Sequence, residues 1–310
     1  MTSPTPPGRT LRPGQRCRIW VHHLAGGPQL VHESTDVLLE APNWDGDGRL
    51  VLNGGGLLWE LAVDGSAGPR QIPARALPPV NNDHVLSPDG GDIFASAEDW
   101  QIYRLPREGG TAQRITSGRG LHFLHGVSPD GSTLAYVRID PDAADPATSG
   151  RVQLVGSDGR EDRPLTTLPG PDDGPEFSPD GAWVYFTTEA FTDTPGHAQI
   201  ARIRPDGTDL ERLTHGAGVD WFPHLSPDGT RATYLTYAAG TRGHPADQSV
   251  TLTVVDVADW AAPLATLHLT GGQGTINVNS WAPDSTAFAY VDYPAAPSGV
   301  PASGSAVRRI

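Results

Sequence analysis

A short turn motif recurs along this chain and constrains its fold more than any other feature. Four copies of Ser-Pro-Asp-Gly and two looser versions, DGDG and APDS, lie at 45–48, 87–90, 128–131, 178–181, 226–229 and 282–285. A capping hydroxyl at the first position, proline at the second and glycine at the fourth are typical of a type I turn. Successive aspartates of the set lie 41 to 56 residues apart, which is the period of a propeller blade or a similar array.

Each turn is followed by the same succession of short apolar segments. An alternating segment comes first, as in STLAYVRI (132–139) and AWVYFTTE (182–189), and a second follows, as in QIYRLPREGG (101–110) and QIARIRPDGT (199–208). A short piece such as RIT (114–116) closes the unit. Counting the residues before the turn, each unit predicts four antiparallel strands. One such sheet cannot bury both faces alone, so the units must stack, and radial stacking protects their edges.

The chain therefore predicts an all-β fold, a six-bladed β-propeller with four strands per blade. The last turn is followed by only one strand, and CRIWVHHLAGG (17–27) and PQLVHES (28–34) match the missing outer strands. We expect the last blade to be closed by these N-terminal strands. The predicted organisation is a flexible N-terminal arm (1–16), a single propeller (17–293) and a flexible C-terminal tail (294–310). The 37 glycines and 30 prolines agree with many short strands and tight turns.

Charge and composition narrow the classes of partner. A net charge of −14 argues against nucleic acid and against anionic membrane surfaces as partners. No apolar run approaches the 18 residues of a membrane span. The first residues, MTSPTPPGRTLRPGQ, lack the apolar segment of an export signal, and a lone Cys17 fits a reducing compartment. We therefore expect a cytoplasmic protein.

The repeat resembles that of TolB-like propellers over residues 17–293, on the SPDG turns and the IYRLPREGG…RIT segments behind them. It is also similar to the propellers of prolyl-oligopeptidase-type enzymes and of oligogalacturonate lyases. The stretches NNDHVLSPDG (81–90), DDGPEFSPDG (172–181) and DWFPHLSPDG (220–229) resemble a cytoplasmic bacterial subgroup of TolB-like proteins. The resemblance implies the fold, while one propeller hosts many activities. Without an export signal or an N-terminal α/β domain, a role in the Tol–Pal envelope system is not expected.

Polar residues upstream of the turns are the candidate site, because the first strand of each blade lines the central channel and these positions converge there. The predicted ligand-binding residues are Glu40, Asn43, Asn82, Asp83, His84, His122, His125, Asp172, Asp173, Glu176, Asp220, Trp221, His224, Gln273 and Asn277. Aspartates and asparagines at strand starts also cap turns, which is the structural interpretation of the same residues. The loop TRGHPADQSV (241–250) could carry His244 and Asp247 toward the same ligand.

The histidines and acids of this set allow two kinds of chemistry. Three of them from different blades could hold a divalent metal ion, and the candidates are His84, His125, Asp173, Glu176 and His224. Without metal, a histidine beside a carboxylate could act as a general base, so His84, His125, Glu176 and His224 are also the catalytic candidates. The chain contains no GxSxG nucleophile elbow, phosphate-binding loop or CxxC motif.

Two functional hypotheses follow. The first is a binding module that captures a small molecule, for example a sugar or uronate, or a protein or peptide partner at the channel mouth. The alternative is a metal-assisted carbohydrate-active enzyme, a lyase or hydrolase, as the resemblance to oligogalacturonate lyases implies. Catalysis requires the acids and histidines to converge within a few ångströms of one point, whereas binding tolerates a looser spread.

Overall fold

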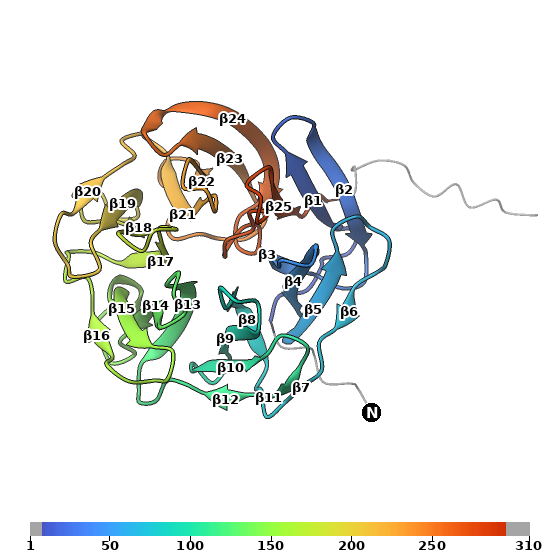
Figure 1. Ribbon diagram of the computed structural model, residues 1–310. Helices are drawn as coiled ribbons and strands as arrows, with labels where there is room; N and C mark the ends of the chain where they lie inside the picture. The colour runs from blue at the N-terminus through green and yellow to red at the C-terminus, as the bar shows by residue number, and fades with distance from the viewer. Residues whose placement is uncertain (1–7, 296–310) are drawn as a thin grey trace, which may run out of the picture.

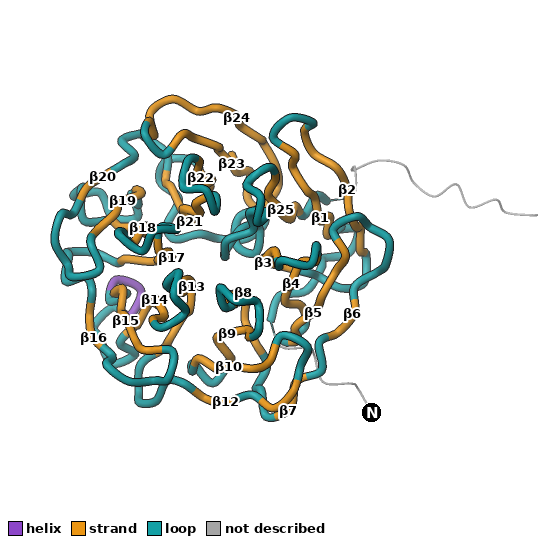
Figure 2. Tube along the Cα trace, viewed as in Figure 1, coloured by secondary structure: helices purple, strands orange, loops and turns teal. Residues whose placement is uncertain are grey.

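The computed structural model describes residues 8–295 and shows six sheets arranged around a central channel (Figure 1). In the described residues, strands and loops make up almost the whole chain, with a single short 3₁₀ helix at Pro146–Thr148 (Figure 2). The prediction of an all-β six-bladed propeller is confirmed. Residues 1–7 of the predicted arm and 296–310 of the predicted tail lie outside the described residues.

Five blades each contain four antiparallel strands, numbered here from the channel outward. Blade 1 comprises β3 (Glu40–Trp44), β4 (Arg49–Gly54), β5 (Leu57–Ala62) and β6 (Arg70–Gln71). Blade 2 comprises β8 (Val80–Leu86), β9 (Asp92–Ala97), β10 (Ile102–Pro106) and β12 (Gln113–Arg114). Blade 3 comprises β13 (Leu121–Val127), β14 (Thr133–Ile139), β15 (Arg151–Gly156) and β16 (Arg163–Pro164). Blade 4 comprises β17 (Asp172–Phe177), β18 (Val184–Thr188), β19 (Gln199–Ile203) and β20 (Glu211–Arg212). Blade 5 comprises β21 (Val219–Leu225), β22 (Arg231–Tyr237), β23 (Gln248–Asp256) and β24 (Asp259–Gly271).

Blade 6 joins the two ends of the chain, as the sequence predicts. Its strands are β25 (Ala287–Asp292), β1 (Cys17–His23) and β2 (Gly27–Ser34), and Ile19 pairs with Val291 across the β1–β25 ladder. The inner position is held by residues 275–281, which pair irregularly with β25: a bridge joins Trp281 to Phe288, and the amides of Ala289 and Val291 donate to the carbonyl oxygens of Ser280 and Thr275. The side chains of Thr275 and Asn277 accept hydrogen bonds from the amides of Gly272 and Gly274. This local bonding competes with regular strand pairing, and an irregular segment takes the place of the expected fourth strand.

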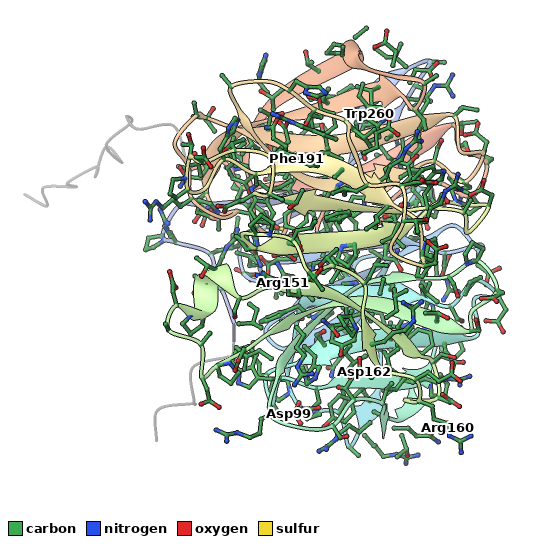
Figure 3. All side chains as sticks on the ribbon, turned by 90° about the vertical axis from the view of Figure 1, so that its left-hand side faces the viewer. Asp99, Arg151, Arg160, Asp162, Phe191 and Trp260 are labelled. Carbon is green, nitrogen blue, oxygen red and sulfur yellow. The ribbon has the colours of Figure 1, made fainter. Side chains whose placement is uncertain are left out.

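Apolar side chains fill the spaces between adjacent blades. Phe186 and Val184 of blade 4, for example, belong to one buried cluster with Val152 and Leu154 of blade 3. Figure 3 views the ring from its edge and shows Trp260 of blade 5 above Arg151 of blade 3. A parallel pair, β7 (Ala74–Arg75) with β11 (Gly110–Thr111), links blades 1 and 2 at the periphery. Among residues 8–295, no helix has the length and apolar character needed to cross a membrane.

The repeated turn is stabilised by its own side chains. In the copy at 226–229, Ser226 Oγ donates to Asp228 (2.6 Å) and accepts from the amide of Arg231 (3.0 Å). Asp228 in turn accepts from the amide of Thr230 (3.0 Å), and Gly229 takes a φ of 70°, which favours glycine. The serine and the aspartate together satisfy backbone groups that the tight turn leaves unpaired, which explains why both recur.

We expect Ser226→Ala to lower the free energy of unfolding by about 1–2 kcal/mol, because Ser226 is buried and its loss leaves the Arg231 amide without an acceptor and removes one donor from Asp228. Thr230→Ala is the matched control, since its exposed hydroxyl bonds to the same carboxylate, and it should cost less than about 0.5 kcal/mol. Urea denaturation of both variants measures the difference. Equal losses would mean that the serine does not organise the turn.

Candidate functional site in the central channel

Bulges in three inner strands determine which side chains face the channel. Ala41, Gly174 and Phe222 occupy the same position, four residues before the turn, and all have a positive φ, of 53°, 59° and 59°. The strand register shifts at each of them. Residues three apart normally lie on opposite sides of a strand, and the extra residue of a bulge brings them to one side. Asp173 and Glu176 therefore both reach the channel.

Four titratable side chains form what we call the channel cluster: Asp83, His125, Asp173 and His244. His125 Nε2 lies 3.1 Å from Asp173 Oδ1, and His244 Nε2 lies 3.5 Å from Asp173 Oδ2. His125 Nδ1 lies 3.3 Å from the carbonyl oxygen of Asn277. These residues come from blades 2, 3 and 4 and from the loop at 241–250, so the structure brings distant segments together as the sequence predicts for Asp83, His125 and Asp173. The loop also carries His244 inward.

The electrostatics of the cluster favour a charged His125. Burial alone would lower the pKa of His125, but the carboxylates of Asp83 and Asp173 outweigh it and raise this pKa to about 9. Burial also opposes ionisation of Asp173, yet hydrogen bonds from His125 and His244 hold the pKa of Asp173 well below its usual range. The pKa of Asp83 is raised, chiefly by burial. At neutral pH the cluster thus contains a buried imidazolium paired with the Asp173 carboxylate.

A second set of polar side chains, the interblade network, consists of Asn43, Glu176, His224 and Asn279. Glu176 accepts from the Leu225 amide (2.8 Å), from Asn279 Nδ2 (2.7 Å) and from His224 Nδ1 (2.6 Å). His224 Nε2 lies 2.5 Å from the carbonyl oxygen of Ile276, so both ring nitrogens have a polar neighbour inside the protein. The network thereby ties blades 4, 5 and 6 to one another.

Asn43 extends the interblade network to the next two blades. Its Nδ2 donates to the carbonyl oxygen of Asn279 (2.5 Å), and its Oδ1 accepts from the amide of Leu86 (2.9 Å). Blades 6, 1 and 2 are thus joined by one side chain. The hydrogen-bonding groups of Asn43, Glu176 and His224 are used inside the protein, which gives these three predicted site residues a structural role.

A cavity of about 480 Å³ opens at the turn end of the channel. All six blades contribute to its wall, through the residue before each turn and the prolines of five turns: Trp44, Leu86, Val127, Phe177, Leu225, Trp281, Pro88, Pro129, Pro179, Pro227 and Pro283. The polar lining deeper in the channel is Asn43, His125, Glu176 and Asn279. The cavity therefore combines an apolar wall with a polar base, and it lies where the inner strands end, not at the strand starts.

Two predicted histidines lie away from the channel cluster. His84 is fully buried, and its Nε2 contacts the carbonyl oxygen of Val51 (3.3 Å) between blades 2 and 1. Burial lowers the pKa of His84 to about 4, so it is neutral. His122 Nδ1 contacts the carbonyl oxygen of Trp100 (2.7 Å), and its ring packs on Tyr136. The structure therefore does not bring His84 and His122 together with His125. Among residues 8–295, no group of three or more histidine, cysteine or acidic side chains is arranged to hold a metal ion.

Two of the predicted acids lie between blades. Asp220 accepts from Thr236 Oγ1 (2.7 Å) and from Gln199 (3.4 Å). Asp172 is buried, and burial raises its pKa to about 6. Asp172 is the first residue of β17 and Asp220 the second of β21, and their carboxylates face side chains of neighbouring segments, not the backbone amides that the capping interpretation requires.

Three other predicted site residues, Asn82, Trp221 and Asn277, are buried. Trp221 packs edge-on against His244, with ring centres 4.5 Å apart. Asn82 and Asn277 are buried, and the Nδ2 atom of each lacks a hydrogen-bond partner in the structure. Asn277 Oδ1 accepts from the amide of Gly274 (2.6 Å). Asn277 thus lies beside both Asp83 and His125 of the channel cluster.

The strand-start end of the channel contains Glu40 and the Gln273 carbonyl, and both contact Arg9. Arg9 belongs to the predicted N-terminal arm, whose residues 8–16 lie against the propeller. Sequence reasoning missed Arg9, since nothing in a lone arginine of a proline-rich segment marks its partners. It also missed the apolar wall, although an apolar residue before every turn is visible in the sequence.

The fold and the site define a six-bladed β-propeller with an acid–histidine cluster in its channel and a cavity at the turn end. No protein-family model matches the chain. An uncharacterized protein of Agrobacterium fabrum is 36% identical over 295 residues, which cover 93% of this chain and 95% of that protein. A TolB-type structure from Agrobacterium tumefaciens is 36% identical with a TM-score of 0.82, covering 90% of this chain and 99% of that one. The chain belongs to the TolB-like propeller family.

A more distant structural neighbour is an oligogalacturonate lyase in complex with manganese. It is 15% identical with a TM-score of 0.51, and the match covers 71% of this chain and 62% of the lyase. At this level of identity the likeness concerns the fold alone. The resemblance to TolB-like propellers is confirmed, and the likeness to oligogalacturonate lyases holds for the propeller fold.

Proposed function

We propose that the protein is a binding propeller that holds a ligand, a small molecule or a segment of a protein partner, in the turn-end cavity. The observation that carries the proposal is the cavity itself, because all six blades contribute to its wall and its base is polar. Its volume of about 480 Å³ lies in the range of small-molecule sites. A rigid ring with an apolar wall can bury an apolar group, and the polar base limits how deeply that group enters.

The charge around the opening favours a cationic ligand. The turn aspartates Asp89, Asp130, Asp180, Asp228 and Asp284 have lowered pKa values, because serine or threonine hydroxyls of the same turns bond to their carboxylates. They remain ionised at neutral pH; Asp89 lines the cavity, and the other four each directly follow a proline of its wall, so they place negative charge at its rim. An apolar cation is therefore expected to bind more tightly than an anion such as a uronate.

The alternative of a metal-assisted carbohydrate lyase or hydrolase receives less support from the channel cluster. A general base must be neutral in order to accept a proton. The pKa of about 9 keeps His125 protonated at pH 7, where it donates hydrogen bonds. The cluster is therefore better suited to fixing charge than to abstracting a proton.

The proposal is tested by the fluorescence of Trp44 and Trp281, which both line the cavity. Titration with benzyltrimethylammonium should give a saturable change, at least about tenfold tighter than with phenylacetate or galacturonate, because only the first matches the apolar wall and the acidic rim. Val127→Phe should weaken this binding at least about tenfold by filling the cavity. Ile139→Phe, a partly exposed position outside the cavity, is the control.

Equal binding by wild type and Val127→Phe would place the ligand elsewhere. Equal affinity for the cation and the anions would contradict the expectation that the turn aspartates favour a cationic ligand. Cleavage of oligogalacturonate by the protein with added Mn²⁺, abolished in His125→Gln, would replace the binding proposal with the enzymatic alternative.

A further inference from the structure

The strand-start end of the channel contains a bound guanidinium that belongs to the chain itself. Arg9 Nη1 donates to Glu40 Oε1 (2.9 Å) and to the carbonyl oxygen of Gln273 (2.6 Å). Arg9 Nη2 lies 3.4 Å from Asp247 Oδ1, and the guanidinium carbon lies 4.2 Å from the centre of the Tyr293 ring. We call Glu40, Asp247, the Gln273 carbonyl and Tyr293 the guanidinium cage.

The chemistry of the cage is specific for a guanidinium group. Two carboxylates and a carbonyl accept from a planar set of N–H donors, while an aromatic face packs against the flat surface of the cation. The side chains of Glu40 and Asp247 are only 8% and 10% exposed, so a ligand there is largely shielded from water. At Gly274, a Cβ would overlap the Glu40 carboxylate and the Tyr293 hydroxyl, so this glycine keeps the cage open.

Buried polar atoms without partners lie beside the cage. Asn53 donates to Glu40 Oε2 (3.3 Å), but its Oδ1 has no partner, and neither has the buried hydroxyl of Tyr237. The Nε of Arg9 is also buried and unpartnered. Both Arg9 and the residues beside the cage therefore keep polar atoms without a hydrogen-bond partner. This is expected of an occupant that another ligand could replace.

The arm that carries Arg9 is held to this end of the channel mainly by side chains. Among residues 8–295, no backbone hydrogen bond joins Gly8–Leu11 to the propeller. Arg12 bonds to Asp247 while its side chain stays 72% exposed, and the first backbone bond to the ring is that of Arg16 to Pro294. Withdrawal of Arg9 thus requires no strand to separate.

We propose that the guanidinium cage is a binding site for the arginine side chain of a partner peptide, and that Arg9 is its internal competitor. The site lies at the opposite end of the channel from the turn-end cavity and takes a different chemical group, so it is independent of the function proposed above. Arg9 and the incoming arginine exclude each other, and binding releases the arm.

The test is chemical rescue of full-length Arg9→Ala. The probe is N-acetyl-L-arginine amide, and the readout is the melting temperature as a function of probe concentration. We expect a saturable rise at millimolar probe in Arg9→Ala, at least about fivefold larger than in wild type or in Arg12→Ala, which keeps the cage occupied. N-acetyl-L-lysine amide and the neutral isostere N-acetyl-L-citrulline amide should give less than about one tenth of the effect.

Two further arms complete the experiment. Arg9→Gln serves as a second emptied cage if Arg9→Ala does not fold, and adding Gly274→Ala to either variant should abolish the rescue. In wild type, a saturating arginine-bearing peptide should increase hydrogen exchange of the Arg12 amide, which donates to Gln15 Oε1 (3.0 Å) while the arm is docked. A probe that stabilises all variants equally, or lysine and citrulline amides that match arginine, would overturn the assignment of the cage. Unchanged exchange in the arm would overturn the competition.

Discussion

Glu176→Ala is expected to lower the free energy of unfolding by about 3–5 kcal/mol, the largest effect of any single substitution considered for the channel. The carboxylate is buried and accepts from Leu225, from Asn279 and from His224, so its removal leaves three donors unsatisfied. One of the three is a buried imidazole that also faces the carbonyl oxygen of Ile276. Chemical denaturation at neutral pH measures the loss.

A double-mutant cycle separates this network from a simple loss of packing. The effects of Glu176→Ala and His224→Ala on the free energy of unfolding should couple by more than about 1 kcal/mol, because each substitution removes the hydrogen-bond partner of the other residue. Tyr185→Phe is a control in the same blade, since its hydroxyl accepts from Arg202 at the partly buried edge, and it should cost about 1 kcal/mol or less. Strict additivity of the two mutations would show that the pair makes no joint contribution.

The recurrence of the turn was sufficient to predict the fold, because the Ser–Asp pair satisfies the turn locally and does not depend on distant contacts. Ring closure followed from counting strands, and the pairing of Ile19 with Val291 confirms it. The inner position of blade 6 was harder to predict. Side chains bond to the backbone amides of Gly272 and Gly274, so this segment forms a turn where the other blades have a strand. Such a segment shows no alternation of apolar and polar residues from which a strand could be predicted.

The site was only partly predictable, because alternation along a strand does not reveal where a bulge lies. His125 and Asp173 converge in the channel as expected. His84, by contrast, contacts the carbonyl oxygen of Val51 in the neighbouring blade. The positive φ at Phe222 would have identified one bulge, but a phenylalanine gives no sign of a left-handed conformation in sequence. Arg9 depends wholly on tertiary contacts, and no local pattern predicts it.

The stability of the protein is expected to fall by about 1.6 kcal/mol between pH 7.5 and pH 9 through His125 alone. Its pKa is raised to about 9 in the folded state, against an ordinary value of 6.5. The folded protein therefore binds more protons than the unfolded chain in this interval, so this stabilisation is fully present below pH 6.5 and is lost as the pH rises through 9. Asp173, with a lowered pKa, acts in the opposite sense and only in acid.

Urea denaturation of wild type and His125→Gln at the two pH values isolates this contribution, because all other groups are common to both proteins. Burial raises the pKa of Glu40 to about 7, so the end of its titration falls within the interval, but it contributes equally to both proteins and cancels in the comparison. Asp173→Asn should also flatten the pH dependence, since the carboxylate is one of the charges that keep His125 protonated. If wild type and His125→Gln lose stability in parallel, the imidazole is neutral in the folded protein, and the electrostatic argument against a general base no longer holds.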